Sequence, residues 1–187
     1  MIAPIHHFFE IRGTIMIKYL LAAGALLVLG TNAALAHITL ETQEAAVGST
    51  YKAVLRVPHG CDGKATTAVR VQIPEGVIAV KPMPKPGWTL QTKKGKYEKS
   101  YQLYGQAVAD GVKEVDWSGG NLPDEFYDEF VFRATLTADL PAGQKLYFPV
   151  VQECGDAAAR WIEIPAAGQD KDALETPAPG IKLTPKR

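Results

Sequence analysis

Apolar and polar side chains alternate along much of the chain after residue 48, a pattern that predicts β-strands. In Ser49–Pro58, apolar side chains occupy every second position from Tyr51 to Val57, as in a strand with one buried face. Comparable segments recur at intervals of about 8–12 residues. A sandwich of about eight strands is expected from Ser49–Pro58 and the following candidate segments: Thr66–Pro74, Gly76–Val80, Trp88–Thr92, Lys99–Leu103, Val112–Trp117, Phe130–Thr137, Lys145–Gln152 and Arg160–Ile164.

The segments between these strands are rich in proline and glycine. Lys81–Gly87 contains three prolines and predicts a stiff turn, and Ser118–Pro123 predicts a tight loop. Beyond residue 36 no helical periodicity of useful length appears. We therefore expect an all-β domain over residues 37–168, an antiparallel β-sandwich of the immunoglobulin or cupredoxin kind with Greek-key connections. Residues 169–187 are polar and proline-rich, which predicts a flexible tail.

The N-terminal segment has the three parts of a secretory signal peptide. Lys18 supplies a positive charge, Leu20–Leu29 is an apolar run too short for a comfortable membrane span, and Ala34–Ala36 forms an A-x-A cleavage site. The whole of residues 1–36 is therefore predicted to be removed, with Met16 as an alternative start. Cleavage leaves His37 as the first residue of a periplasmic or secreted protein with no stable membrane insertion.

Charge and cysteine content narrow the range of functions. The 20 basic residues balance the 20 acidic ones, which argues against a nucleic-acid-binding protein. The only two cysteines are Cys61 and Cys154. In an exported protein they are expected to form a disulfide. A thiolate pair binding a metal is the alternative, but neither cysteine belongs to a C-x-x-C motif.

The predicted mature chain lacks the residues of several common sites. Its only histidines are His37 and His59, and it has no G-x-S-x-G motif for a serine hydrolase. A blue-copper centre needs two histidines, a free cysteine and usually a methionine nearby, whereas Cys154 has no histidine near it and Met83 is the only methionine left. We therefore expect no enzymatic activity.

A histidine at the new N-terminus is the arrangement that remains. Cleavage after Ala36 would free the α-amine of His37, so the amine and imidazole nitrogens of one residue could chelate one ion. Nitrogen donors in a tetragonal array favour Cu(II).

Several longer motifs point in the same direction. They are A-H-I-T-L-E, V-P-H-G-C-D-G, K-P-G-W, V-D-W-S-G-G-N-L-P-D-E-F-Y-D-E-F and Y-F-P-V-V-Q-E-C. In this order they resemble the YcnI-like copper-binding family, exported bacterial β-sandwich proteins implicated in copper homeostasis. The resemblance implies a mono-histidine brace with Cu(II) on His37, a carboxylate assigned to Glu129, and an indole from Trp161 or Trp117. It implies copper as the cargo and other envelope copper-handling proteins as possible partners.

Each assignment has a structural alternative. Glu129 could be a solvated edge charge, with Glu41 or Glu44 as the carboxylate instead; Glu41 shares the strand parity of His37. Either tryptophan could be a core residue. His59 fits a turn residue beside the disulfide better than a ligand.

Three functions follow from these observations. The favoured one is an exported copper chaperone or sensor. The second is a structural envelope sandwich that holds no metal. The third is a histidine-brace copper oxidase or monooxygenase, which needs a second histidine that only His59 could supply.

Overall fold

The alternating segments form strands in the computed structural model, which describes residues 37–170 and 173–186. The predicted signal peptide lies outside these residues. The described part of the chain contains no α-helix, so the all-β prediction is confirmed. Its twelve strands are β1 (Thr39–Leu40), β2 (Glu44–Ala46), β3 (Thr50–Val57), β4 (Thr66–Gln72), β5 (Val77–Pro82), β6 (Thr89–Leu103), β7 (Gln106–Leu122), β8 (Asp128–Leu136), β9 (Lys145–Tyr147), β10 (Val150–Cys154), β11 (Ala157–Trp161) and β12 (Gly180–Thr184).

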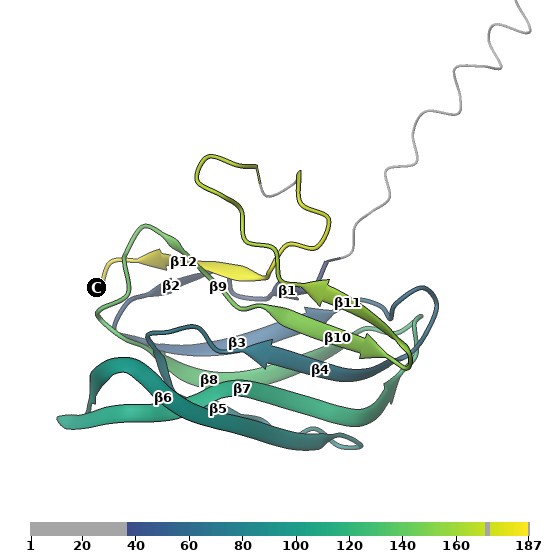
Figure 1. Ribbon diagram of the computed structural model, residues 1–187, viewed down its shortest axis with the longest axis horizontal. Coiled ribbons are helices and arrows are strands. Elements are labelled where there is room, and N and C mark those ends of the chain that lie inside the picture. Colours follow the sequence, from purple (N-terminus) through teal and green to yellow (C-terminus); the bar gives the residue numbers. More distant parts are fainter. Residues whose placement is uncertain (1–36, 171–172, 187) are drawn as a thin grey trace, which may run out of the picture. The chain divides into compact units, whose positions relative to one another are not determined.

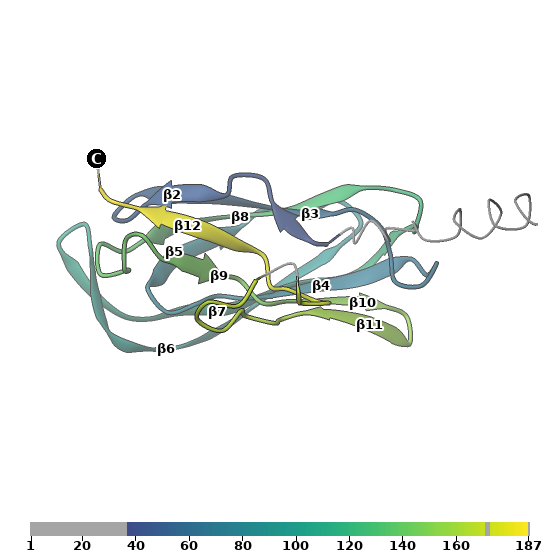
Figure 2. The same ribbon diagram turned by 90° about the horizontal axis from the view of Figure 1, so that it is seen from above.

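The strands form two larger sheets and one small one (Figure 1). The first sheet has the order β1-β3-β8-β5 and the second β11-β10-β4-β7-β6, with antiparallel pairing throughout. Figure 2 shows them as two layers. Between β3 and β8 the chain passes back and forth between the two sheets, as in Greek-key sandwiches. The β1 edge of one sheet and the β11 edge of the other carry the candidate site.

The core lies between the two larger sheets. In β8, Phe130, Phe132, Ala134 and Leu136 are all buried, as the alternation predicts. Trp117 on β7 is fully buried and packs edge-on against Phe130, with ring centroids 5.7 Å apart. Large aromatic side chains bury the most apolar area per residue, so these rings contribute strongly to the stability of the sandwich.

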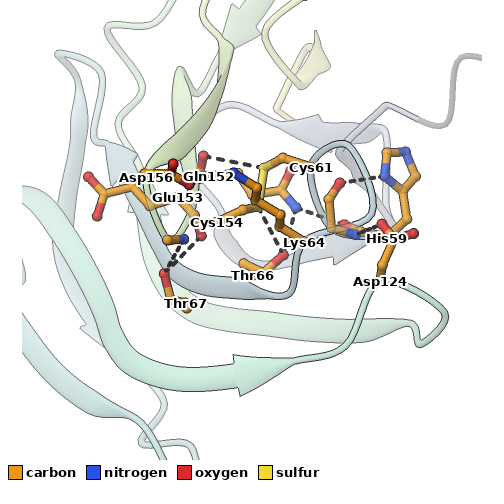
Figure 3. Close-up of a disulfide and its surroundings, with 12 residues drawn as sticks. His59, Cys61, Lys64, Thr66, Thr67, Asp124, Gln152, Glu153, Cys154 and Asp156 are labelled. Carbon is orange, nitrogen blue, oxygen red and sulfur yellow. Dashed lines mark hydrogen bonds and ion pairs between the residues drawn. A yellow bond between two sulfur atoms is a disulfide. The ribbon is translucent and has the colours of Figure 1, made fainter.

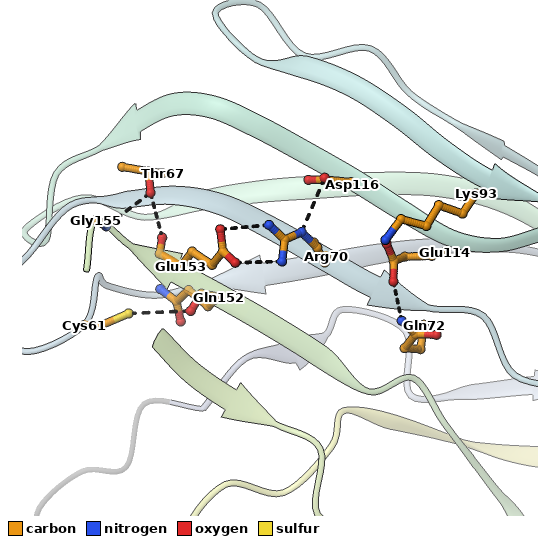
Figure 4. Close-up of polar contacts among 10 residues, drawn as sticks. All are labelled: Cys61, Thr67, Arg70, Gln72, Lys93, Glu114, Asp116, Gln152, Glu153 and Gly155. Atoms are coloured by element: carbon orange, nitrogen blue, oxygen red, sulfur yellow. Dashed lines mark hydrogen bonds and ion pairs between the residues drawn. The ribbon is translucent and has the colours of Figure 1, made fainter. Parts of the chain in front are cut away.

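The outer face of the second sheet is held by ionic contacts across its strands (Figure 4). Arg70 on β4 reaches Glu153 on β10 at 2.7 Å and Asp116 on β7 at 3.4 Å. Burial opposes the charge of Arg70, but the two carboxylates outweigh it and raise the pKa of this guanidinium. Successive side chains on a strand point to opposite faces. Because Glu153 points outward, its neighbour Gln152 points into the core.

Two predicted boundaries inside the second sheet are wrong. Ser118–Pro123 was expected to be a loop, but β7 continues through it to Leu122. A Cβ at Gly120 would lie 2.1 Å from the Trp88 indole, so the glycine admits this ring rather than making a turn. Trp88–Thr92 and Lys99–Leu103 were expected as separate strands, but Thr89–Leu103 forms the single long strand β6.

The predicted flexible tail is also wrong for its last residues. Gly180–Thr184 forms β12, which pairs in parallel with β2 and antiparallel with β9. Ile181 and Leu183 are buried against the core, whereas Lys182 between them is exposed. The domain therefore extends past residue 168, and pairing with β2 and β9 holds this short strand in place. No helix in the described ranges is long and apolar enough to cross a membrane.

Candidate metal site at His37

His37 lies at the start of the first sheet, just before β1. The side chains of residues 37–41 alternate between exposed or half-exposed and buried, so His37, Thr39 and Glu41 share one face, as the parity argument predicted. The imidazole Nε2 is buried and has no hydrogen-bond partner among the described residues. His37 also lines a hollow of about 140 Å³ beside the segment that leads into β12, with Lys145 and Tyr147 on its wall.

Trp161 is the tryptophan that meets His37. The two rings make an edge contact, with centroids 5.4 Å apart and planes inclined by 64°. Trp161 ends β11 and is 7 % exposed. Trp117, the other candidate indole, is buried between the sheets and donates its Nε1–H to the backbone oxygen of Met83 at 3.0 Å. The structure thus places Trp161, and not Trp117, beside His37.

A buried glutamine connects this region to the neighbouring loop. Gln152 on β10 accepts a hydrogen bond from Trp161 Nε1 at 3.1 Å. Its amide nitrogen donates to the backbone oxygen of His59 at 2.7 Å and to Thr66 Oγ1 at 2.8 Å. Gln152 is 1 % exposed, and each of these bonds satisfies a polar group that has little access to water. The same residue therefore fixes the indole and the chain at His59.

His59 lies in the turn that contains one half of the disulfide (Figure 3). Cys61 is bonded to Cys154, which confirms the predicted bridge. The backbone groups of Cys61 and Lys64 exchange two hydrogen bonds, and Gly60 N–H donates to Asp124 Oδ1 at 2.9 Å. A Cβ at Gly60 would lie 1.8 Å from the backbone oxygen of Lys64, so this turn requires glycine.

The side chain of His59 is turned away from the disulfide (Figure 3). Its Nδ1 lies 2.6 Å from the backbone oxygen of Gly60. A carbonyl oxygen can only accept, so Nδ1 carries the proton, and in the neutral ring Nε2 bears the lone pair.

Glu129, the carboxylate assigned by resemblance, lies on β8 with its side chain half exposed. It accepts a hydrogen bond from Tyr127 OH and lies 3.9 Å from Arg56 Nε. Burial and this hydrogen bond raise the pKa of Tyr127 to about 12. In the strand order β1-β3-β8, Arg56 stands between Thr39 and Glu129. Glu129 therefore already has two partners, and Arg56 separates it from the strand that follows His37.

The alternative carboxylates also have other partners. Glu41 pairs with Arg56 at 3.2 Å, on the same face as Glu129. Glu44 on β2 pairs with Lys182 of β12 at 3.5 Å. Within residues 37–170 and 173–186, no group of three or more His, Cys, Asp or Glu side chains is arranged to hold a metal ion. A site with three or more ligands here therefore needs at least one donor besides these side chains, and a free α-amine at His37 would be one.

Gln152 is the residue of this region that the sequence analysis missed. A signal was available, since Gln152 alternates with Val150 and Cys154 in a strand whose inward side chains are otherwise apolar. A polar side chain on a buried face needs hydrogen-bond partners, and here these are an indole, a hydroxyl and a backbone carbonyl.

Comparisons with known proteins give a structure of similar fold and the family of the domain. The crystal structure of an uncharacterized protein from Nocardia farcinica, described as an immunoglobulin-like fold, is similar, with 26% sequence identity and a TM-score of 0.58. The similarity covers 79% of this chain and 98% of that one. No curated protein matches. The family described as "Domain of unknown function (DUF1775)" matches residues 37–183. The chain therefore belongs to the DUF1775 family, which is the YcnI-like family that its motifs resemble.

Proposed function

We propose that the mature protein is an exported copper-binding protein that takes part in copper homeostasis or trafficking. Copper is its cargo, bound as Cu(II) by the α-amine and imidazole of His37 after cleavage at Ala36. The observation that carries the proposal is the setting of His37, with its ring packed against Trp161 and its Nε2 buried without a partner. The alternative of a sandwich that holds no metal leaves this setting of His37 without a function.

The buried Nε2 fits this mode of binding. The amine lies on the backbone side of the imidazole, so only Nδ1 can bind the same ion as the amine. A metal on Nδ1 fixes the tautomer with the proton on Nε2. In the structure Nε2 is buried without a hydrogen-bond partner, in a ring that packs edge-on against the Trp161 indole. A buried Nε2 that carries the proton leaves Nδ1 as the ligating nitrogen.

The hollow beside His37 favours exchange of the ion over permanent storage. It is lined by His37, Gln43, Lys145 and Tyr147, and by prolines of the segment before β12. A site with few protein ligands and an open side leaves room for a donor or acceptor of copper. A resident metal would be more fully enclosed.

The carboxylate is a separate part of the proposal. Binding of Cu(II) by Glu129 would require its carboxylate to leave Tyr127 and Arg56. Glu129→Gln tests this directly, because it removes the charge and keeps the shape. A loss of Cu(II) affinity of about tenfold or more, that is about 1.4 kcal/mol, would make Glu129 a ligand. A smaller change would leave it as the partner of Tyr127.

The experiment that tests the proposal compares two forms of the mature protein that differ only at the α-amine. Both begin at His37, but one carries an acetyl group on its α-amine, so that the imidazole is the same and the amine can no longer bind an ion. Both are titrated with Cu(II) against a competing chelator. We expect the acetylated form to bind at least about tenfold more weakly, because it loses one of two chelating nitrogens. Equal affinity would refute the proposal.

A further inference from the structure

We propose that the imidazole Nε2 of His59 supplies a third nitrogen to the copper bound at His37. This inference rests on the proposed function, and it adds a ligand that the mono-histidine pattern does not contain. It assigns to the turn before Cys61 a role in binding, in addition to its role in the fold.

Strand register brings the two histidines to one end of the first sheet. β1 and β3 are antiparallel with Thr39 opposite Arg56 and Leu40 opposite Leu55. His37 and His59 each lie two residues beyond these paired strands, before Thr39 of β1 and after Val57 of β3, so both leave the first sheet at the same end. Residues directly opposite in neighbouring antiparallel strands have Cα atoms about 4.5–5.5 Å apart, so the two histidines start from adjacent strand ends.

A chain of contacts through the core connects the same two residues. The ring of His37 meets the ring of Trp161, whose Nε1–H donates to Gln152, whose amide donates to the backbone oxygen of His59. Gln152 and Trp161 are both buried, at 1 % and 7 % exposure. The positions of the two histidines are therefore set by one rigid group and not by separate mobile loops.

The hydrogen bond of His59 prepares it as a ligand. Metal-binding histidines commonly donate the N–H of one ring nitrogen to a backbone carbonyl or carboxylate, which fixes the tautomer and orients the other nitrogen. Nδ1 of His59 makes such a bond with the backbone oxygen of Gly60. Its Nε2 is left unprotonated, and the half-exposed side chain gives that nitrogen access to an ion.

The turn that holds His59 is unusually constrained. The bridge from Cys61 to Cys154, the bond from Gly60 N–H to Asp124 and the bond from Gln152 hold it on three sides. Rigid support of this kind lowers the cost of bringing a ligand to a metal. With the amine and imidazole of His37, Nε2 of His59 gives three nitrogen donors, a set suited to tetragonal Cu(II) with one position open.

The test compares the Cu(II) spectrum and the Cu(II) affinity of variants at His59 with those of the parent, all in the form that begins at His37. His59→Gln and His59→Ala each remove the imidazole. Asp62→Asn is the matched control, since it alters an exposed side chain of the same turn at a positive φ of 51° that asparagine tolerates. Electron paramagnetic resonance reports the number of nitrogens bound to Cu(II), and a chelator competition gives the affinity.

We expect both His59 variants to lose one nitrogen from the spectrum and at least about tenfold in affinity, since loss of even an outer-shell partner typically costs 10–100-fold. Asp62→Asn should match the unaltered protein. Thermal unfolding without copper verifies that the variants are folded. If the parent binds Cu(II) and the His59 variants keep its spectrum and affinity, the third-nitrogen proposal is refuted and the role of His37 stands. If the parent itself fails to bind, or if the form acetylated at the α-amine of His37 binds equally well, the proposed function fails instead.

Discussion

The indole of Trp161 and the amide of Gln152 are joined by a 3.1 Å hydrogen bond in the buried region next to His37. The amide nitrogen of Gln152 donates hydrogen bonds to the backbone oxygen of His59 and to the hydroxyl oxygen of Thr66. A change at Gln152 should therefore affect both the stability of the sandwich and the geometry of the candidate site.

Gln152→Met tests this connection. Methionine nearly fills the same volume, but it leaves the Trp161 N–H, the His59 carbonyl and the Thr66 hydroxyl without their partner. We expect a loss of about 2–4 kcal/mol in the free energy of unfolding, measured by urea denaturation, because buried polar groups without partners are costly. Cu(II) affinity should fall as well.

Gln72→Met is the matched control for this substitution. Gln72 lies on β4, is exposed and bonds to Glu114, which also pairs with Lys93. Its replacement should change stability by no more than about 0.5 kcal/mol. Equal losses of unfolding free energy for Gln72→Met and Gln152→Met would show that the buried hydrogen bonds of Gln152 add no stability beyond that of an exposed bond.

The disulfide should contribute to both stability and binding. It closes a loop of 93 residues, for which chain-entropy estimates give about 4–5 kcal/mol. We expect the double variant Cys61→Ser, Cys154→Ser to lose stability of that order and to bind Cu(II) more weakly, because the turn of His59 loses its anchor. Denaturant titration and chelator competition measure the two effects. Mass spectrometry after alkylation without reductant checks the bridge itself, and two free thiols in the purified protein would contradict it.

The sandwich was predictable because its strands have clear alternation. Phe130, Phe132 and Leu136 occur at even spacing and are all buried, so their pattern fixes β8 from the sequence alone. The last strand was missed because β12 has only two buried apolar residues in a proline-rich surrounding. Its stability comes from pairing with β2 and β9, which are distant in sequence. Local composition cannot reveal such pairing.

The site was predictable only in part for a related reason. The signal-peptide pattern identified His37 as a candidate residue from sequence alone, but a choice between Trp117 and Trp161 requires knowing which strand edge lies near the N-terminus. Trp161 is at the end of β11, an edge strand, and Trp117 is on β7, a central one. The contact of His59 with Gln152 joins residues 93 apart, and no spacing rule predicts it.

Removal of one inward side chain from β12 tests whether the C-terminal strand is part of the domain. Ile181→Ala should destabilise the protein by about 2–5 kcal/mol, because Ile181 is fully buried and alanine leaves a cavity. The adjacent Lys182→Ala is the control, since Lys182 is exposed and its pair with Glu44 is worth at most about 1 kcal/mol. Thermal or urea unfolding measures both. A flexible tail would make the two substitutions equally harmless.

The acid stability of the protein should depend on Glu75, which precedes β5. Its carboxylate accepts hydrogen bonds from Lys113 Nζ at 2.7 Å, Tyr101 OH at 2.8 Å and the backbone N–H of Glu98 at 3.1 Å. Burial opposes ionisation, but these bonds outweigh it and lower the pKa of Glu75 below its ordinary value of 4.5. A lowered pKa in the folded state means that the ionised group stabilises the fold at neutral pH. That contribution is lost as pH falls through the pKa of the folded state.

Glu75→Gln should therefore lower the free energy of unfolding by about 1–2 kcal/mol at pH 7, where bonds to a charged acceptor are at full strength. Below about pH 5 the parent begins to lose this contribution, so the difference between parent and variant should shrink and then disappear. Urea denaturation from pH 7 to pH 3 measures it. Glu125→Gln removes the same charge from an exposed side chain and should change stability by no more than about 0.5 kcal/mol at pH 7. If the difference in unfolding free energy between the parent and Glu75→Gln stayed constant with pH, the substitution would act through packing. A contribution from the ionised carboxylate must instead change with pH, because the carboxylate takes up a proton.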